Sequence, residues 1–121
     1  MSETARQTGS LKDRSCKPCR EGTPPIIGED LRQMRAMLDE GWNVIGEHHI
    51  EKEFKFRDWA EAQDFTKRVA DLAQQEDHHP DILLQWGKVK VTLWTHKING
   101  LSQNDFILAA KTDEIARQIQ P

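Results

Sequence analysis

The sequence predicts an α+β domain in which three helices pack on one face of a four-stranded antiparallel sheet. Two observations favour this fold class. Apolar residues recur at helical or strand spacing in the order helix, two strands, helix, two strands, helix. The strands of each pair are only a few residues apart, whereas a parallel pair would need a helical crossover between its strands. At 121 residues the chain can bury one core but is short for two domains.

The first 27 residues are expected to form a flexible lead-in, followed by a single domain at residues 28–121. The lead-in contains a Cys-x-x-Cys motif at residues 16–19 and two adjacent prolines, Pro24 and Pro25, which do not fit a helix. Residues 1–24 offer little apolar surface to pack, so their deletion is expected to leave fold and activity largely intact.

The first helix and the first pair of strands come next. Apolar residues recur at helical spacing between residues 29 and 38, and Gly41 fits a C-terminal cap. Strands are expected at residues 42–45 and 50–56, and residues 46–49 form the hairpin turn between them.

The longest amphipathic helix is expected after this hairpin. Asp58 and Glu61 have the spacing of a capping box, and one apolar face continues from them to about residue 75. A short strand at residues 82–86 and a strand rich in β-branched residues at 89–95 form the second pair. The last helix begins after a second capping sequence at residues 102–105.

Charge and hydropathy exclude several classes of partner. Lys and Arg number 17 against 20 Asp and Glu, a formal net charge of -3, and no basic stripe is present, so direct nucleic-acid binding is not expected. No apolar run approaches the roughly 20 residues that cross a bilayer, and the N-terminus does not resemble a secretory signal. We therefore expect a cytoplasmic protein with no membrane partner, whose two cysteines stay reduced.

Three histidines near the second pair of strands are the strongest functional signal. His78 and His79 follow the longest helix, and Pro80 favours extended geometry at the residue before it. His96 ends the last strand on the face opposite the apolar residues, so it is expected to point away from the core. Histidine is the side chain whose charge ordinarily changes near neutrality, and this grouping therefore indicates proton chemistry or metal binding.

A second histidine pair, His48 and His49, lies in the expected hairpin turn. No third histidine is near it in the sequence. We interpret this pair as surface turn residues away from the site, and we expect its replacement to leave activity almost unchanged.

The spacing of His78-His79-Pro80, Trp86, His96 and Asp105 closely resembles the signature of pterin-4a-carbinolamine dehydratases, also called 4a-hydroxytetrahydrobiopterin dehydratases. The resemblance extends from about Glu29 to Ile119 and so covers the whole expected domain. It implies the same α+β fold, with a pterin cleft lined by the histidines.

This resemblance also implies an activity. The expected reaction is dehydration of a 4a-hydroxytetrahydropterin to quinonoid dihydropterin, which recycles the pterin cofactor of aromatic amino acid hydroxylases. His78 and His96 would be the acid/base pair, and His79 would bind and orient the pterin. Supporting or substrate-binding groups would be Asp77, Thr95, Trp42, Gln74 and Asp105. No metal or organic cofactor is implied, and the expected partners are a small-molecule pterin and further copies of the chain in a dimer or tetramer.

Two of these residues carry a qualification. Many members of the resembled family have an acidic residue where this chain has Gln74, so a neutral amide must take its place here, or Glu76 substitutes. Trp42 could cover a flat pterin, but a tryptophan at the start of a strand is as often part of the core.

Two alternative functions remain open at this point. Three histidines and the Cys-x-x-Cys motif are possible zinc ligands, although the second cysteine pair of a compact zinc module is absent. The other alternative is a non-catalytic dimerisation or interaction module, because some members of the resembled family also act as dimerisation cofactors of a transcription factor.

Overall fold

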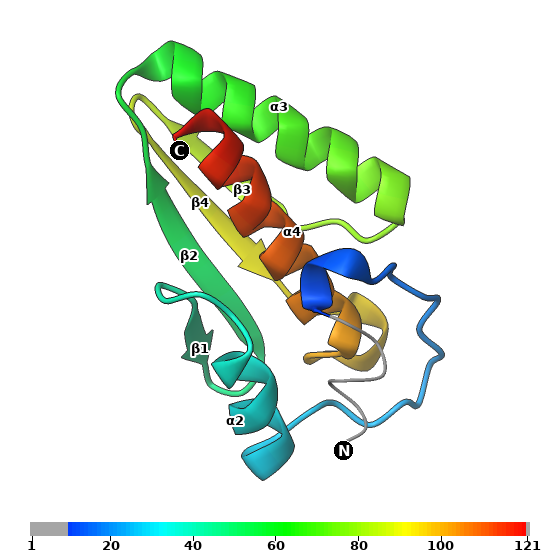
Figure 1. Ribbon diagram of the computed structural model, residues 1–121. Helices are drawn as coiled ribbons and strands as arrows, with labels where there is room; N and C mark the ends of the chain where they lie inside the picture. The colour runs from blue at the N-terminus through cyan, green and yellow to red at the C-terminus, as the bar shows by residue number, and fades with distance from the viewer. Residues whose placement is uncertain (1–9, 121) are drawn as a thin grey trace.

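The computed structural model describes residues 10–120, and their centre is a four-stranded antiparallel sheet in the order β1-β2-β4-β3 (Figure 1). The strands span Asn43–Ile45 (β1), His49–Lys55 (β2), Asp81–Gln85 (β3) and Lys88–Leu93 (β4). The helices span Gly28–Ala36 (α2), Trp59–Glu76 (α3) and Gln103–Ile119 (α4), and short 3-10 helices span Leu11–Asp13 (η1) and His96–Ile98 (η2). This architecture confirms the α+β fold class predicted from the sequence.

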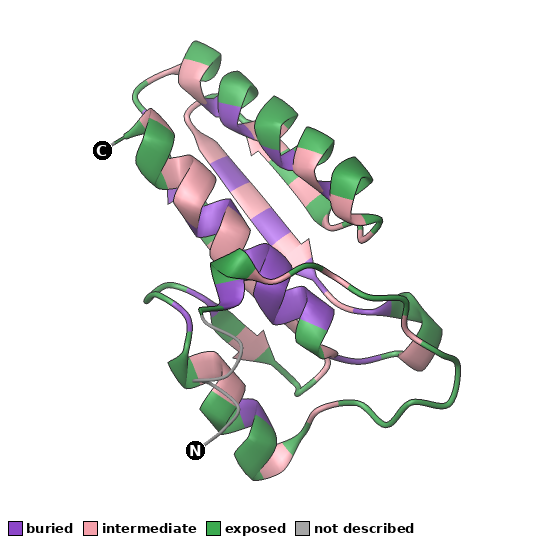
Figure 2. Ribbon diagram, turned by 45° about the vertical axis from the view of Figure 1, so that its right-hand side comes forward, coloured by how far each residue is buried: buried purple, intermediate pink, exposed green. Residues whose placement is uncertain are grey.

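The core lies between the sheet and the two long helices, α3 and α4, which cross the same face of the sheet (Figure 1). Along β4, buried residues alternate with half-buried ones, as Figure 2 shows. Val89, Val91 and Leu93 are buried beneath the helices, whereas Lys90 and Thr92 lie on the open face. The alternation along β4 therefore sets which of its side chains face the helices and which face away from them.

Helix α3 begins and ends with recognisable caps. The Asp58 carboxylate accepts a hydrogen bond from the Glu61 backbone N–H at 3.0 Å, as the capping sequence predicts. At the other end Asp77 adopts a left-handed backbone with φ 55° and ψ 41°, and its N–H donates to the Ala73 carbonyl. Because α3 ends sharply here, His78 and His79 lie in the short connection between α3 and β3.

Two local expectations need correction. Helix α2 ends at Ala36 with Met37 as its cap, so Gly41 is not the helix cap. Gly41 instead takes a φ of 103° in the turn before β1, where an added Cβ would lie 2.9 Å from the Lys52 side chain. The second correction concerns β4, which ends at Leu93 rather than at Thr95, because the chain turns into η2 and Thr95 pairs with Gly100 in an isolated bridge.

The N-terminal segment packs on the domain more closely than its composition suggests. We call residues 10–27 the strap. Its Leu11 is only 3% exposed and belongs to the hydrophobic core, and η1 lies against α4, as the blue segment of Figure 1 shows. Residues 1–9 of the expected lead-in and Pro121 lie outside the described residues. The expected boundary at residue 28 thus does not separate a packed part from an unpacked one.

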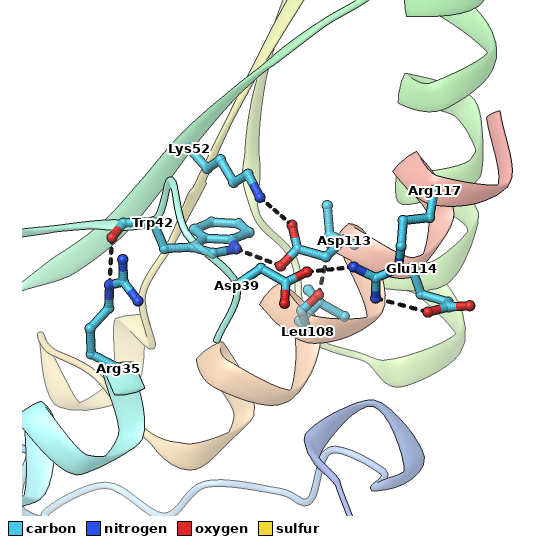
Figure 3. A network of polar contacts seen from close by, with 9 residues as sticks. Arg35, Asp39, Trp42, Lys52, Leu108, Asp113, Glu114 and Arg117 are labelled. Carbon is cyan, nitrogen blue, oxygen red and sulfur yellow. Dashed lines mark hydrogen bonds and ion pairs between the residues drawn. The ribbon is translucent and has the colours of Figure 1, made fainter. Parts of the chain in front are cut away.

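A polar network ties the strands to α4 on the side of the molecule shown in Figure 3. Asp113 is 3% exposed, and its carboxylate accepts hydrogen bonds from Lys52 at 2.6 Å and from the Trp42 indole at 2.9 Å. Burial raises the pKa of Asp113, and this effect outweighs the opposite effect of its hydrogen bonds. Lys52 occupies a position on the inward face of β2, and this pairing satisfies its charge.

Candidate active site

A pocket of about 360 Å³ lies where the end of α3, the segment after β4 and the start of α4 meet. The strap forms its remaining wall. The lining residues are Cys16, Lys17, Pro18, Cys19, Glu76, Asp77, His78, His79, Trp94, Thr95, His96, Lys97 and Asn104. The three histidines singled out in the sequence therefore share one pocket.

His78 is held by a buried carboxylate at the back of the pocket. Its Nε2 lies 2.6 Å from Oδ1 of Asp105, whose side chain is fully buried. The other carboxylate oxygen of Asp105 accepts hydrogen bonds from the Thr95 hydroxyl at 2.8 Å and from the Ser102 backbone N–H at 2.9 Å. Since the carboxylate accepts, His78 donates through Nε2–H, and its Nδ1 is left to accept or deliver a proton.

Asp105 thus combines two tasks. It closes the first turn of α4 through the Ser102 N–H, which is the capping role predicted from the sequence. It also fixes the ring plane and the tautomer of His78. The N-terminus of α4 and the orientation of one site histidine therefore depend on the same side chain.

The other two histidines are more exposed and are held differently. The Nε2–H of His79 donates to the Gln74 side-chain carbonyl at 3.1 Å, one turn back on α3. His96 is the first residue of η2, and its ring lies against the Trp94 indole with centroids 4.0 Å apart. An exposed imidazole that is held in place can exchange protons with a bound ligand near neutral pH.

The strap is attached to the pocket by paired hydrogen bonds that the sequence did not reveal. The Asn104 side-chain carbonyl accepts from the Lys17 backbone N–H at 2.9 Å, and its amide donates to the Lys17 carbonyl at 2.5 Å. The Cys16 backbone N–H donates to Glu76 at 2.8 Å, and Lys111 binds the other oxygen of Glu76 at 2.7 Å. These contacts place four strap residues against a site formed by α3 and α4.

The strap also changes the chemistry of two groups. Burial raises the pKa of Glu76, but the hydrogen bonds from Lys111 and Cys16 outweigh burial, so the pKa is lowered overall. Burial, and next the charge of Glu76, raise the pKa of the Cys16 thiol to about 12. Cys16 therefore stays protonated near neutrality, which does not suit a redox-active or metal-binding cysteine.

The structure divides the expected site residues into those that line the pocket, those that contact a lining histidine from outside, and Trp42, which does neither. Those that line the pocket are His78, His79, His96, Asp77 and Thr95. Asp105 and Gln74 lie outside it and contact His78 and His79, respectively.

Trp42 is a correction, because it is 1% exposed, packs edge-on against Phe54 and donates to Asp113 in the network of Figure 3. It belongs to the core, as the alternative interpretation of this residue allowed, and it does not contact the pocket.

The turn pair His48 and His49 also requires correction. His48 lies in the predicted hairpin turn, but its ring packs on Trp94 with centroids 4.3 Å apart. Trp94 in turn contacts His96. The pair is therefore close to the site in space, although its residues are far from His78, His79 and His96 along the chain. Sequence spacing carries no signal of this contact.

Two further observations concern the alternatives raised by the sequence. Within residues 10–120, no three His, Cys, Asp or Glu side chains lie close enough together to hold a metal ion. None of the helices in this part of the chain combines the length and the hydrophobicity needed to cross a membrane.

Comparison with known proteins gives a consistent result over most of the chain. Residues 25–115 match the family described as pterin 4 alpha carbinolamine dehydratase. A relative from Alkaliphilus metalliredigens (strain QYMF) is 50% identical over 105 residues, which cover 87% of this chain and 95% of the relative. A second, from Rubrobacter xylanophilus, is 46% identical and covers 87% and 97%, respectively. Both carry the name "Putative pterin-4-alpha-carbinolamine dehydratase".

Two solved structures share the fold. A protein from Brucella melitensis described as a transcriptional coactivator/pterin dehydratase is 32% identical, with a TM-score of 0.72 over 76% of this chain and 98% of that one. A pterin dehydratase-like protein described as a RuBisCO assembly factor in the alpha-carboxysome is 25% identical, with a TM-score of 0.57 over 64% of this chain and 90% of that one.

Proposed function

This chain belongs to the pterin 4 alpha carbinolamine dehydratase family, and from this membership we propose that it dehydrates a 4a-hydroxytetrahydropterin to quinonoid dihydropterin. The observation that carries the proposal is the buried Asp105 carboxylate bonded to His78 at the pocket wall. It supplies an imidazole with a fixed tautomer, which a proton-transfer site requires.

The reaction needs two proton transfers. One proton must reach the 4a-hydroxyl oxygen so that the C–O bond breaks and water leaves, and one must be removed from a ring nitrogen so that a C=N bond forms. His78 and His96 line the same pocket and come from different elements, His78 from the end of α3 and His96 from the segment after β4. We assign the two transfers to this pair, one as general acid and the other as general base.

The remaining polar groups support binding. His79, oriented by Gln74, is an exposed residue of the pocket lining and can hydrogen-bond to the pterin. Asp77 also lines the pocket, and its carboxylate can accept hydrogen bonds from ring or amino N–H groups. Thr95 has its hydroxyl proton committed to Asp105, so it acts on His78 indirectly. The product would return to the cofactor cycle of aromatic amino acid hydroxylases.

The test is the dehydration rate of a 4a-hydroxytetrahydropterin generated in situ, with and without the protein. His78→Ala and His96→Ala should each lower kcat by about 10²- to 10⁴-fold, the usual contribution of a positioned general acid or base. His79→Ala should act mainly on KM. Lys67→Ala, on the exposed side of α3, is the control and should match the parent. Full activity in folded His78→Ala and His96→Ala would refute the assignment.

We also propose that the chain forms a dimer or tetramer, because β1 and β3 leave two open edges on a small sheet. Light scattering at micromolar concentration should give a mass of at least twice 14.0 kDa. A monomer under these conditions would contradict this.

A second candidate function is a non-catalytic interaction module. It is favoured by the descriptions of the two solved relatives, one a transcriptional coactivator/pterin dehydratase and one a RuBisCO assembly factor. This candidate predicts no dehydration above the uncatalysed rate in the folded parent protein. The same assay therefore separates the two functions.

A further inference from the structure

His48 of the β1–β2 turn packs on Trp94, which lines the pocket and packs in turn on the site histidine His96. We propose that His48 is a positioning residue that holds the His96 imidazole in its working orientation. The role in turnover rests on the dehydratase function proposed above. The structural part of the inference concerns the orientation of His96 alone.

The first observation is a row of three rings. The Trp94 ring lies between the two imidazoles, with its centroid 4.3 Å from that of His48 and 4.0 Å from that of His96. The interplanar angles are 44° and 48°. Trp94 is half-buried and His96 is exposed, so solvent can reach His96 from the pocket side. Without the contact from His48, the Trp94 indole and the His96 imidazole would sample several rotamers.

The second observation is a hydrogen bond that fixes His48 itself. Its Nε2 lies 3.0 Å from Oδ1 of Asn99, the residue that ends η2 in a left-handed conformation with φ 51°. His96 is the first residue of η2. His48 therefore contacts the residue two positions before His96 and the residue three positions after it, and so it supports both ends of the loop that carries the site histidine.

The third observation gives the protonation pattern of the pair. Because the Asn99 carbonyl accepts, His48 donates through Nε2–H, and its Nδ1 is the acceptor for the Nδ1–H of His49, 2.9 Å away. His49 is the first residue of β2, so the outer end of the row belongs to a strand of the sheet. The support behind His96 is attached to a rigid element rather than to a free loop.

Loss of this support should act on the chemical step more than on binding. His48 does not line the pocket, so it makes no contact with a bound ligand. A misplaced general acid or base nonetheless lowers the rate, because proton transfer requires hydrogen-bond reach. We therefore expect kcat to fall in His48→Ala while KM changes by less than about twofold.

The decisive experiment is a double-mutant cycle. His48→Ala should lower kcat by about tenfold in the parent, yet have no further effect in the His96→Ala background, because its action passes through His96. His48→Phe keeps a ring against Trp94 and should restore kcat to within about threefold of the parent. Trp59→Ala removes a partly exposed ring at the start of α3, away from the pocket lining, and is the matched control. An unchanged kcat in His48→Ala, or an equal loss in the His96→Ala background, would overturn the proposal.

A second readout is independent of activity. Because the His96 and Trp94 ring centroids are only 4.0 Å apart, the indole ring current should shift the NMR signals of the His96 ring protons, and His48→Ala should move these signals towards those of a freely rotating histidine. Unchanged signals would refute the positioning role even in an inactive protein. An inactive parent whose His96 signals do move would refute only the dehydratase function, and the two failures are therefore distinguishable.

Discussion

The carboxylate of Asp105 illustrates how much of this site depends on one side chain. It is fully buried, and its three donors are an imidazole, a hydroxyl and a backbone N–H. A buried carboxylate is tolerable only when such donors satisfy it, and the same donors are thereby fixed in position. The cap of α4 and the orientation of His78 are consequently inseparable.

Replacement of Asp105 by Asn tests this dependence. The amide keeps the shape but removes the charge, so we expect kcat to fall by about ten- to a hundredfold, since His78 loses its charged acceptor. An amide has one acceptor oxygen, so it cannot serve both His78 and the cap of α4, and the loss of one of these bonds should cost about 1–2 kcal/mol of stability. Circular dichroism melts alongside the dehydration assay separate the two effects. A variant less stable by this amount but with normal kcat would show that Asp105 serves α4 alone.

The strap shows why an element can escape sequence reasoning. Its composition is polar, and its only buried apolar side chain among residues 10–20 is Leu11. The strap is held by contacts with residues that are distant in the sequence, such as the two hydrogen bonds between the Lys17 backbone and the Asn104 side chain. Hydrophobic periodicity detects an element that packs along its length, but it cannot detect one that is held at a few points.

Because the strap contacts both the core and the pocket, we now expect its removal to lower stability and weaken substrate binding. Deletion of residues 1–24 should lower stability by about 2–4 kcal/mol, from the burial of Leu11 and the lost hydrogen bonds, and should raise KM because a pocket wall is missing. Urea denaturation and KM measurement test both.

Point variants give the matched comparison for this deletion. Leu11→Ala should account for about 2 kcal/mol with KM nearly unchanged, and Asn104→Ala should raise KM. Lys12→Ala, at a half-exposed neighbour, should be neutral. Parent-like stability and KM in the deleted protein would show that the strap contributes nothing.

The molecule as a whole is held together across its layers by the network of Lys52, Trp42 and Asp113 (Figure 3). Lys52 lies on β2, Trp42 directly precedes β1 and Asp113 lies on α4, so the network joins sheet to helix, and none of the three lines the pocket. Removing one member of a buried ion pair is costly because the other charge remains.

Lys52→Met should therefore destabilise the protein by about 2–4 kcal/mol at pH 7. The cost should shrink on acidification. Burial raises the folded-state pKa of Asp113, so the folded protein takes up a proton more readily than the unfolded chain, and a neutral Asp113 no longer needs Lys52. Urea titrations at pH 7 and near pH 4.5 measure the difference. Lys67→Met is the exposed control, and a cost independent of pH would contradict this account.

Features of the fold and site that depend on interactions between residues close in the sequence could be predicted, whereas those that depend on contacts between distant segments could not. The order of elements was predictable because helical and strand periodicity, capping sequences and short turns act within a few residues. His78, His79, His96 and Asp105 could be assigned to the site because their spacing in the sequence matches the signature of the family. The contacts of His48 with Trp94, and of the strap with α4, depend on how distant segments meet, and no local pattern encodes them. Trp42 was assigned to the pocket because an exposed aromatic and a core aromatic look alike in sequence.

The Lys17–Asn104 pairing has a consequence for biosynthesis. Its two residues are 87 positions apart, so the wall of the pocket cannot close until the start of α4 has left the ribosome. The strap is the first of the described segments to be made and must wait for α4, which is the last. Closing so long a loop has an entropic cost that only a formed partner surface repays. The nascent chain therefore acquires its sheet before it acquires a complete binding pocket.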